Sequence, residues 1–325
     1  MIKNQWYAIL PSKEVKKDKI VGVRRLGLNL CLFRNDEGTI GCLIDKCTHR
    51  GAAISKGEHK GNCVACPFHG IRFDKDGKTV LVPANGRIAE PEQRFNVKSY
   101  LVKEAHGMIY FWNGDKEKAT EKLPFFDDQI TDDMVYSEMS DLWHAHYSRC
   151  IENQLDVVHI PFVHYNTIGR GNKTVVNGPA MEVMGHTILV SGNNSVDQGQ
   201  APIKANELKI NPHLNLKFIF PNVWQNYIAD DLRVVIFFAP VDDENTMFYI
   251  RFYTNKFKMK FLNQTMAYFG KFANRVIERQ DKVVVETQLP KASSLLGGEN
   301  LLRGDSPIMT YRKIRDTLQK ESESS

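Results

Sequence analysis

Short apolar runs separated by turn residues dominate the first third of the chain. Runs rich in β-branched and aromatic residues, bounded by Asn, Asp and Gly, are typical of strands joined by tight turns. Turn signals of this kind fall at residues 35–38 and 76–77. The region is therefore predicted to be all-β. The predicted strands include residues 21–25, 28–33, 40–44 and 108–112.

A polar stretch at residues 113–118 follows the last of these runs, and Pro124 comes shortly afterwards. Domain boundaries usually fall in exposed polar linkers, where few contacts cross. We therefore expect two domains, residues 1–115 and 116–325, each long enough to bury a core of its own.

The second region mixes helical and strand-like patterns. Residues 147–160 are predicted to be helical, and several strand-like runs follow between residues 180 and 257. A long helix is predicted at residues 258–287, because apolar residues recur there with a helical period. This order favours an antiparallel sheet with helices packed on one side, so the fold class is α+β. The apolar stripe consists of Leu262, Met266, Phe269, Ala273, Ile277 and Val284.

Composition narrows the setting in which the protein works. The net charge of +5 is modest and spread along the chain, so no nucleic-acid partner is indicated. No stretch approaches 18 apolar residues, and the first residues lack the apolar core of a signal peptide, so neither a membrane span nor secretion is expected. The six cysteines are then expected to be reduced or to bind metal, in the cytoplasm.

Two short segments each pair a cysteine with a histidine. Cys47 and His49 lie in the first, and Cys66 and His69 lie in the second. Two thiolates and two imidazoles suit either zinc or a [2Fe–2S] centre. A structural zinc site usually pairs like ligands at short spacing, whereas mixed halves let both thiolates bind one iron and both imidazoles the other. Cys63 keeps a zinc knuckle open as an alternative, because it forms a Cys-x2-Cys pair with Cys66.

With sixteen residues between its halves, this pattern resembles the Rieske motif, whose second half is usually Cys-Pro-Phe-His-Gly. The resemblance implies a [2Fe–2S] cluster on Cys47, His49, Cys66 and His69, and it leaves Cys63 as a nearby free thiol. The extra cysteine pair of respiratory Rieske proteins is absent from both loops, as in Rieske ferredoxins and oxygenases. More than 200 residues follow residue 115, far more than a stand-alone ferredoxin needs.

A second motif lies between residues 153 and 164. Asn153, Asp156 and His159 recur every three residues, so on a continuous helix they would form one stripe. His164 would point away from that stripe, unless Pro161 breaks the helix and lets the chain turn back. Two histidines on such a kinked helix could share a metal ion.

This motif resembles the iron motif of Rieske non-haem iron oxygenases, in the branch that includes dicamba monooxygenase and vanillate O-demethylase. The resemblance implies that His159 and His164 are iron ligands and that Asn153 lies near the iron without binding it. It also implies that Asp156 hydrogen-bonds both His159 and His69 of the partner subunit. Carboxylates outside the coordination sphere commonly fix ligand tautomers in this way.

A 2-His-1-carboxylate site needs one acid. On the predicted long helix, Asp281 continues the apolar stripe, whereas Glu278 and Glu286 fall away from it. An acid on an apolar stripe is costly unless it is paired or metal-bound, so Asp281 is predicted to be the third ligand. A buried salt bridge is the alternative. The segment around Asp281 also resembles the family's third-ligand helix. His144 and His146 match no family ligand and are interpreted as ordinary polar residues.

The resemblance covers nearly the whole chain. It implies an N-terminal all-β Rieske [2Fe–2S] domain followed by a helix-on-antiparallel-sheet catalytic domain with mononuclear Fe(II). The implied protein is the homotrimeric oxygenase component of a monooxygenase, which takes electrons from NAD(P)H through a separate reductase or ferredoxin and uses O2 to hydroxylate or O/N-demethylate a small organic substrate. A ring-hydroxylating dioxygenase is the nearest alternative. A Rieske electron-transfer or iron-sensing protein is the alternative of another class.

Overall fold

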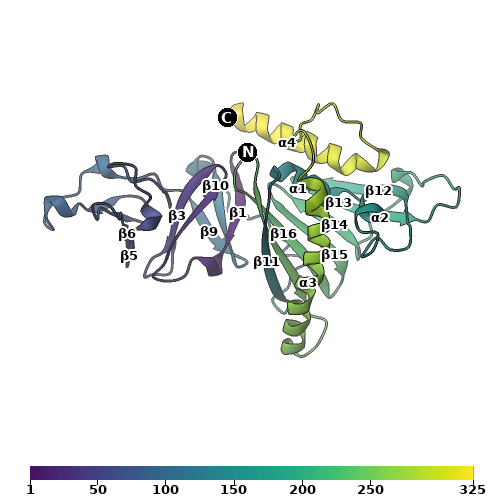
Figure 1. Ribbon diagram of the computed structural model, residues 1–325, viewed down its shortest axis with the longest axis horizontal. Coiled ribbons are helices and arrows are strands. Elements are labelled where there is room, and N and C mark those ends of the chain that lie inside the picture. The colour runs from purple at the N-terminus through teal and green to yellow at the C-terminus, as the bar shows by residue number, and fades with distance from the viewer. Residues whose placement is uncertain (325) are drawn as a thin grey trace. The chain divides into compact units, whose positions relative to one another are not determined.

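The computed structural model describes residues 1–324, which divide into two compact units (Figure 1). The β unit consists of Asn4–Leu123 together with Pro240–Asp242. The α+β unit consists of Met1–Lys3, Pro124–Ala239 and the described residues from Asp243 onward. Each unit buries an apolar core of its own, so the two are described separately.

Small antiparallel sheets make up the β unit. The predicted turn glycines have positive φ angles, +84° at Gly38 and +80° at Gly77, a conformation that glycine adopts without a steric penalty. The predicted all-β character of this region is confirmed. In spatial order, the sheets are β1 (Gln5–Pro11), β10 (Met108–Asn113) and β9 (Val102–Ala105); β2 (Ile20–Arg25), β3 (Leu28–Arg34) and β4 (Ile40–Ile44); and β5 (Glu58–Lys60), β6 (Cys63–Ala65), β7 (Arg72–Asp74) and β8 (Thr79–Leu81).

A seven-stranded sheet forms the base of the α+β unit within the described residues. Its inward-facing residues, with Trp143 stacked on Phe248 at a centroid distance of 4.0 Å, form the larger apolar core. In spatial order the strands are β11 (Val135–Trp143), β17 (Thr246–Thr254), β16 (Leu232–Pro240), β15 (Val223–Ala229), β14 (Asn215–Ile219), β13 (Thr187–Ser195) and β12 (Val175–Met184).

Helices pack against this sheet. Helix α3 (Lys260–Val285) lies across β11 and β17, and α1 (Tyr147–Leu155) contacts both α3 and α4 (Ser306–Ser324) (Figure 1). The short helix α2 (Ile160–Val163) follows α1. The predicted α+β class, with helices on an antiparallel sheet, is confirmed. No helix of the described chain is long and apolar enough to cross a membrane.

The predicted continuous helix at residues 147–160 is wrong. Helix α1 ends at Leu155, and Asp156 has extended angles, φ −78° and ψ 126°. The reason is local: Asp156 Oδ1 accepts the Val158 N–H at 2.6 Å, so its side chain competes with the next helical hydrogen bond. Pro161 does not break a helix. It lies in the first turn of α2, where its missing N–H costs nothing.

The predicted apolar stripe of α3 is also displaced. Phe269 and Val284 are exposed, whereas Glu278 is buried together with Asp281, contrary to the expectation that Glu278 falls away from the buried face. Polar residues occupy this face because each finds a partner. Asn263, for example, exchanges two hydrogen bonds of 2.8 Å with the backbone of residue 257. A period based on apolar residues alone cannot detect such a face.

Candidate metal centres

Three side chains from two segments of the chain converge in the α+β unit. His159 is the N-cap of α2, His164 is its C-cap, and Asp281 lies in the last turns of α3. Their candidate ligand atoms all lie within 4.8 Å of one another. Asp281 Oδ1 is 3.4 Å from His159 Nε2 and 3.0 Å from His164 Nε2. The four-residue helix therefore brings both imidazoles to one carboxylate.

The spacing of these atoms fits a metal ion better than it fits hydrogen bonding. Asp281 Oδ1 is buried and makes no hydrogen bond of acceptable geometry, although two ring nitrogens lie near it. Two ligands at right angles on bonds of about 2.1 Å lie about 3.0 Å apart, close to the observed distances. A 2-His-1-carboxylate set leaves coordination positions open and is typical of non-haem Fe(II).

The two predicted cluster loops of the β unit have matching backbone geometry. In the first loop, Gly51 N–H donates to the Cys47 carbonyl at 2.8 Å, and in the second, Gly70 N–H donates to the Cys66 carbonyl at 3.0 Å. Both glycines have positive φ angles, +76° and +70°, which lets each loop turn back within four residues. Each cysteine therefore begins one tight turn, and the following histidine lies within it.

The sulfurs of these loops are buried and the imidazoles are exposed. Cys47 and Cys66 are 2% and 3% exposed, and burial raises the pKa of the Cys47 thiol. His49 Nδ1 and His69 Nδ1 lie 3.2 Å apart, within reach of one tetrahedral metal ion. Cys63 lies on β6 and donates instead to a backbone carbonyl. The donor set fits a [2Fe–2S] cluster with thiolates on one iron and imidazoles on the other.

Known protein families match both halves of the chain. Residues 5–100 match the Rieske [2Fe-2S] domain, and residues 143–321 match the vanillate O-demethylase oxygenase C-terminal domain. The second match alone covers more than half of the 325 residues. The chain belongs to the Rieske non-haem iron oxygenase family. The predicted family is thereby confirmed, together with the two cofactors of the family, a Rieske [2Fe–2S] cluster and a mononuclear iron.

Individual relatives of this Rieske oxygenase agree with the family match. The vanillate O-demethylase oxygenase subunit of Pseudomonas sp. (strain HR199 / DSM 7063) is 30% identical over 58% of this chain and 52% of its own. The oxygenase component of chloroacetanilide N-alkylformylase from Rhizorhabdus wittichii is 32% identical over 50% of this chain and 47% of its own. The chain thus spans about half the length of these curated relatives.

Solved structures extend the likeness to the whole chain at the level of the fold. Dicamba monooxygenase bound to dicamba superposes with a TM-score of 0.78 at 21% identity, over 100% of this chain and 99% of that one. NdmA of Pseudomonas putida CBB5 superposes with a TM-score of 0.80 at 20% identity, over 98% and 92% of the two chains.

Polar groups lie beside both histidines of the triad in this Rieske oxygenase, although His159 Nδ1 makes no hydrogen bond of acceptable geometry. His164 Nδ1 lies 2.9 Å from Gln280 Oε1, and His159 Nδ1 lies 3.3 Å from Asp156 Oδ2. With the proton on Nδ1, the Nε2 lone pair of each ring faces Asp281, as metal ligation requires. Sequence reasoning missed Gln280, and the predicted role of Asp156 stays a prediction. The one available signal for Gln280 was its position beside the predicted third ligand.

Electrostatics in the triad favours the charged forms of His159 and Asp281. Burial lowers the pKa of His159, but the carboxylates of Asp156 and Asp281 outweigh it and raise that pKa to about 9. Burial raises the pKa of Asp281, but His159 and His164 outweigh it and lower that pKa to about 2. A metal ion would replace the proton on His159 as the positive charge beside these acids.

Asn153 and Asp156 share a cavity wall with His159, although the three do not form the predicted helical stripe, because α1 ends at Leu155. All three side chains line a cavity of about 160 Å³ that also borders His164 and Asp281. The same three also line a second, wider hollow of about 560 Å³. Asp156 and His159 therefore border two separate hollows.

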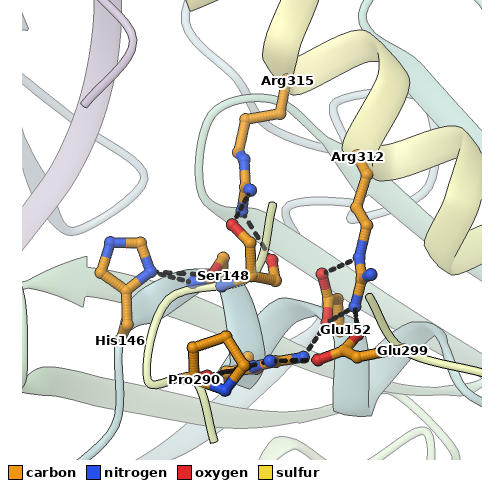
Figure 2. Close-up of polar contacts among 9 residues, drawn as sticks. His146, Ser148, Glu152, Pro290, Glu299, Arg312 and Arg315 are labelled. Atoms are coloured by element: carbon orange, nitrogen blue, oxygen red, sulfur yellow. Dashed lines mark hydrogen bonds and ion pairs between the residues drawn. The ribbon is translucent and has the colours of Figure 1, made fainter. Parts of the chain in front are cut away.

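A buried ion network joins α1 to the C-terminal part of the chain (Figure 2). Glu152 on α1 accepts hydrogen bonds from Arg312 on α4 at 2.8 and 2.9 Å, and from Arg149 at 3.2 Å. Glu299, in the loop before α4, accepts from both arginines. Since α1 leads directly into the triad segment, this network positions that segment. Sequence reasoning missed it because Glu152 and Arg312 are 160 positions apart.

The two other histidines near α1 have ordinary polar partners. His144 Nδ1 lies 2.8 Å from Asn245 Oδ1. His146 caps α1, where its ring accepts the Ser148 N–H at 3.3 Å (Figure 2). Neither belongs to the triad, in agreement with their interpretation from the sequence.

Proposed function

We propose that the chain is the oxygenase component of a multicomponent monooxygenase, which acts on a small organic substrate with O2 and with electrons from NAD(P)H, delivered by a separate reductase or ferredoxin. One oxygen atom enters the substrate, and the other leaves as water with two electrons and two protons. The observation that carries this proposal is the placement of His159, His164 and Asp281 in the wall of the 160 Å³ cavity. The demethylase and monooxygenase names of the relatives support the same class.

In this proposal His159, His164 and Asp281 hold the iron, which supplies the reductive activation of O2 when bound. Gln280 and Asp156 hold the two imidazoles in the ligating tautomer, and the apolar walls keep water from the reacting atoms. Oxidation of a C–H bond beside oxygen or nitrogen leads to demethylation, and oxidation elsewhere leaves an alcohol. The proposed cluster ligands are Cys47, His49, Cys66 and His69.

A homotrimer in which the cluster loops of one subunit dock at the iron site of the next is part of the proposal. The His69 imidazole is exposed, although it is a proposed cluster ligand. Phe68 beside it and Phe162 in α2 are 54% and 61% exposed, which gives both surfaces apolar area to bury. In this assembly Asp156 bridges His159 and His69 of the partner subunit, and the wide hollow receives the loop.

Residues 1–115 are proposed as the cluster-bearing domain and residues 116–325 as the catalytic domain of a cytoplasmic protein. All six cysteines lie within the described residues and are free thiols, the state expected in a reducing compartment.

The test is turnover of the protein loaded with iron and cluster, with a surrogate reductase, NADH and 18O2, against a panel of methoxy and N-methyl compounds. We expect one labelled atom in a hydroxylated product, in step with NADH consumption. In a demethylation the labelled atom leaves with formaldehyde, so there the readout is demethylated product and formaldehyde formed in equal amounts, in step with NADH consumption. His159→Ala should abolish product while the cluster spectrum persists, and His144→Ala, a histidine outside the triad, should retain both. Unchanged turnover in His159→Ala would refute the iron site. A product with both atoms labelled would identify a dioxygenase instead.

A further inference from the structure

One carboxyl group in the wall of the 160 Å³ cavity has no part in the proposed metal site. Glu278 is 6% exposed and lines this cavity together with His159, His164 and Asp281. Residues three apart on a helix are neighbours, with Cβ atoms about 5–6 Å apart, so Glu278 lies one turn of α3 away from Asp281. A carboxyl group is costly to bury unless it is paired or neutral.

A second carboxyl group lies against Glu278. Asp141 and Trp143 are two residues apart on β11, so their side chains project from the same face of the strand. Trp143 Nε1 donates to Glu278 Oε1, and Lys282 Nζ, from the next turn of α3, lies 3.0 Å from Asp141 Oδ2. Between these two contacts, the carboxyl groups of Asp141 and Glu278 are hydrogen-bonded to each other. Both partners of Glu278 thus come from β11, and neither belongs to the triad.

The contact between the two carboxyl groups requires a proton. Ionised carboxylates only accept hydrogen bonds, so two of them bond to each other only when one is protonated. Asp141 also accepts from Lys282 and from the Leu142 N–H at 2.9 Å, which favours its ionised form, whereas Glu278 accepts from the neutral indole of Trp143.

Electrostatics agrees that Glu278 is the neutral member of the pair. Burial, and then the hydrogen bond with Asp141, raise the pKa of Glu278 to about 7. Burial opposes ionisation of Asp141 as well, but the hydrogen bond from Glu278, and then Lys282, lower the pKa of Asp141. Two carboxyl groups that share a site commonly divide in this way.

Asp141 connects this pair to the outside of the protein. Its side chain is 34% exposed, and within residues 1–324 the cavity wall includes Glu278 but not Asp141. The pair therefore reaches from the surface to the cavity. Much of the remaining wall is apolar, with Ile236, Phe248 and Ile250 among its residues, and such side chains carry no proton.

We infer that Asp141 and Glu278 carry protons from solvent to the oxygen that is reduced in this cavity. The inference rests on the proposed oxygenase function, in which O2 takes up two electrons and two protons. Glu278 gives its proton to an oxygen atom in the cavity and becomes a carboxylate. Asp141, protonated from solvent, then returns a proton to Glu278. Two such cycles supply both protons, and neither carboxyl group is oxidised or reduced.

The shared proton can be observed without turnover. Infrared spectra of the iron- and cluster-loaded protein under nitrogen should contain the carbonyl band of a neutral carboxyl group, which shifts to lower frequency in D2O. A carboxyl group is neutral below its pKa, so this band should be strongest at about pH 6 and be lost as the pH rises through about 7. Glu278→Gln should abolish the band. The matched control is Glu286→Gln, on the same helix, where the carboxylate accepts from the His144 N–H, and it should retain the band.

The kinetic test follows O2 uptake with NADH and a surrogate reductase, together with product from the methoxy and N-methyl compounds. Glutamine reproduces neutral glutamic acid, since its oxygen accepts from Trp143 and its N–H donates to Asp141, so Glu278→Gln should retain its Tm and its iron. It releases no proton, so kcat at pH 7 should fall at least about ten-fold while KM is unchanged. The wild-type decline in kcat above about pH 7 should be absent from this variant.

A second variant makes the test independent of the cavity wall. Asp141→Asn removes the solvent end of the route and should also lower kcat at least about ten-fold. Glu286→Gln should turn over as the wild type does.

The outcomes separate the inference from the proposed function. A neutral carboxyl band that persists in Glu278→Gln, or O2 uptake by this variant at the wild-type rate, overturns the inference. Reduction of O2 to hydrogen peroxide also takes two electrons and two protons. If Glu278→Gln loses the band and slows O2 uptake, while the wild type forms peroxide and no organic product, the proton route stands and the oxygenase function is overturned.

Discussion

The side chain of Gln280 links one triad histidine to a neighbouring loop. Its Oε1 lies 2.9 Å from His164 Nδ1 and also accepts from Thr167 Oγ1 at 2.9 Å. Its Nε2 donates to Asn166 Oδ1 at 2.7 Å, which fixes the direction of the amide. Because the amide oxygen faces His164, it favours the tautomer with the proton on Nδ1 and leaves Nε2 as the metal-binding nitrogen.

Replacement of Gln280 should therefore weaken metal binding without removing a ligand. For Gln280→Leu we expect the affinity of the iron-free protein for Fe(II) or Co(II) to fall about 10- to 100-fold, since the imidazole loses its orienting partner. Competition dialysis measures this affinity, and the cluster absorption should not change. Arg279→Leu, an exposed neighbour on the same helix, serves as control. Equal affinity in Gln280→Leu and wild type would show that the amide does not orient the ring.

Sequence reasoning reached the triad but not this amide, for a physical reason. His159, His164 and Asp281 each combine a reactive group with a spacing or a buried position that sequence makes visible. The role of Gln280 depends on a contact with a residue 116 positions away. Similarly, Glu278 was placed on the wrong face, because the hydrogen bond from Trp143 that permits its burial is not encoded in the helical period.

At the scale of elements, the ion network determines where α1 lies. Two arginines and two glutamates balance in charge, and the side chains of Arg149, Glu152 and Arg312 are 6% exposed or less. A buried network of this kind is stable only while each charge retains its partner. The network connects α1 to α4 and to the loop before α4. The loss of one ion pair would therefore let α4 and this loop shift relative to α1.

Glu152→Gln should destabilise the α+β unit strongly. The substitution keeps the shape of the side chain but leaves two buried arginines with one carboxylate, at a cost of about 3–5 kcal/mol. Chemical denaturation of the iron-free protein measures the loss. On the same C-terminal helix, Asp316→Asn breaks the exposed pair with Lys320 and should cost less than about 1 kcal/mol. A similar small loss in both variants would mean that the network does not hold α1.

The ion network also predicts that the protein loses stability at acid pH. Hydrogen bonding from Arg149, and then from Arg312, lowers the pKa of Glu299 despite its partial burial. A carboxyl whose folded pKa is depressed contributes stability above its unfolded value, about 4.3, and this contribution is lost as pH falls through the folded value. The difference in Tm between wild type and Glu299→Gln should therefore be full at pH 6 and shrink steadily below about pH 4. A difference independent of pH would exclude ionised Glu299 as its source.

The ends of the helices and strands show which local signals can be read from the sequence and which cannot. Strands β2, β3 and β4 were predicted nearly to the residue, because turn residues separate them clearly. The end of α1 was missed by five residues, since Asp156 is a plausible helix residue until its side chain bonds to the backbone two positions on.

At the scale of the whole molecule, Asp156 contacts two subunits in the proposed trimer: it bridges His159 of its own subunit and His69 of the partner subunit. Asp156→Asn should leave both metal sites loaded, since neither loses a ligand, and should slow electron transfer from cluster to iron by at least about ten-fold. Single-turnover kinetics measure this: the cluster is reduced beforehand, substrate and O2 are added, and cluster reoxidation is followed against product. Asp128→Asn, which removes an exposed carboxylate paired with Lys217 at 3.1 Å in the same unit, is the control. Reoxidation at the wild-type rate in Asp156→Asn, or a fully active monomer by light scattering, would refute the bridging role.

The way the chain is shared between its two units limits how they can be exchanged between relatives. Ile2 is 1% exposed in the core of the α+β unit, whereas the residues from Asn4 to Leu123 form the β unit. The link between β16 and β17 returns Pro240–Asp242 to the β unit. A chimera joined only at residue 123 would therefore take residues 1–3 of its α+β unit from the wrong parent. It would also take residues 240–242 of its β unit from the wrong parent. A graft that transfers electrons normally should need four junctions, after residues 3, 123, 239 and 242.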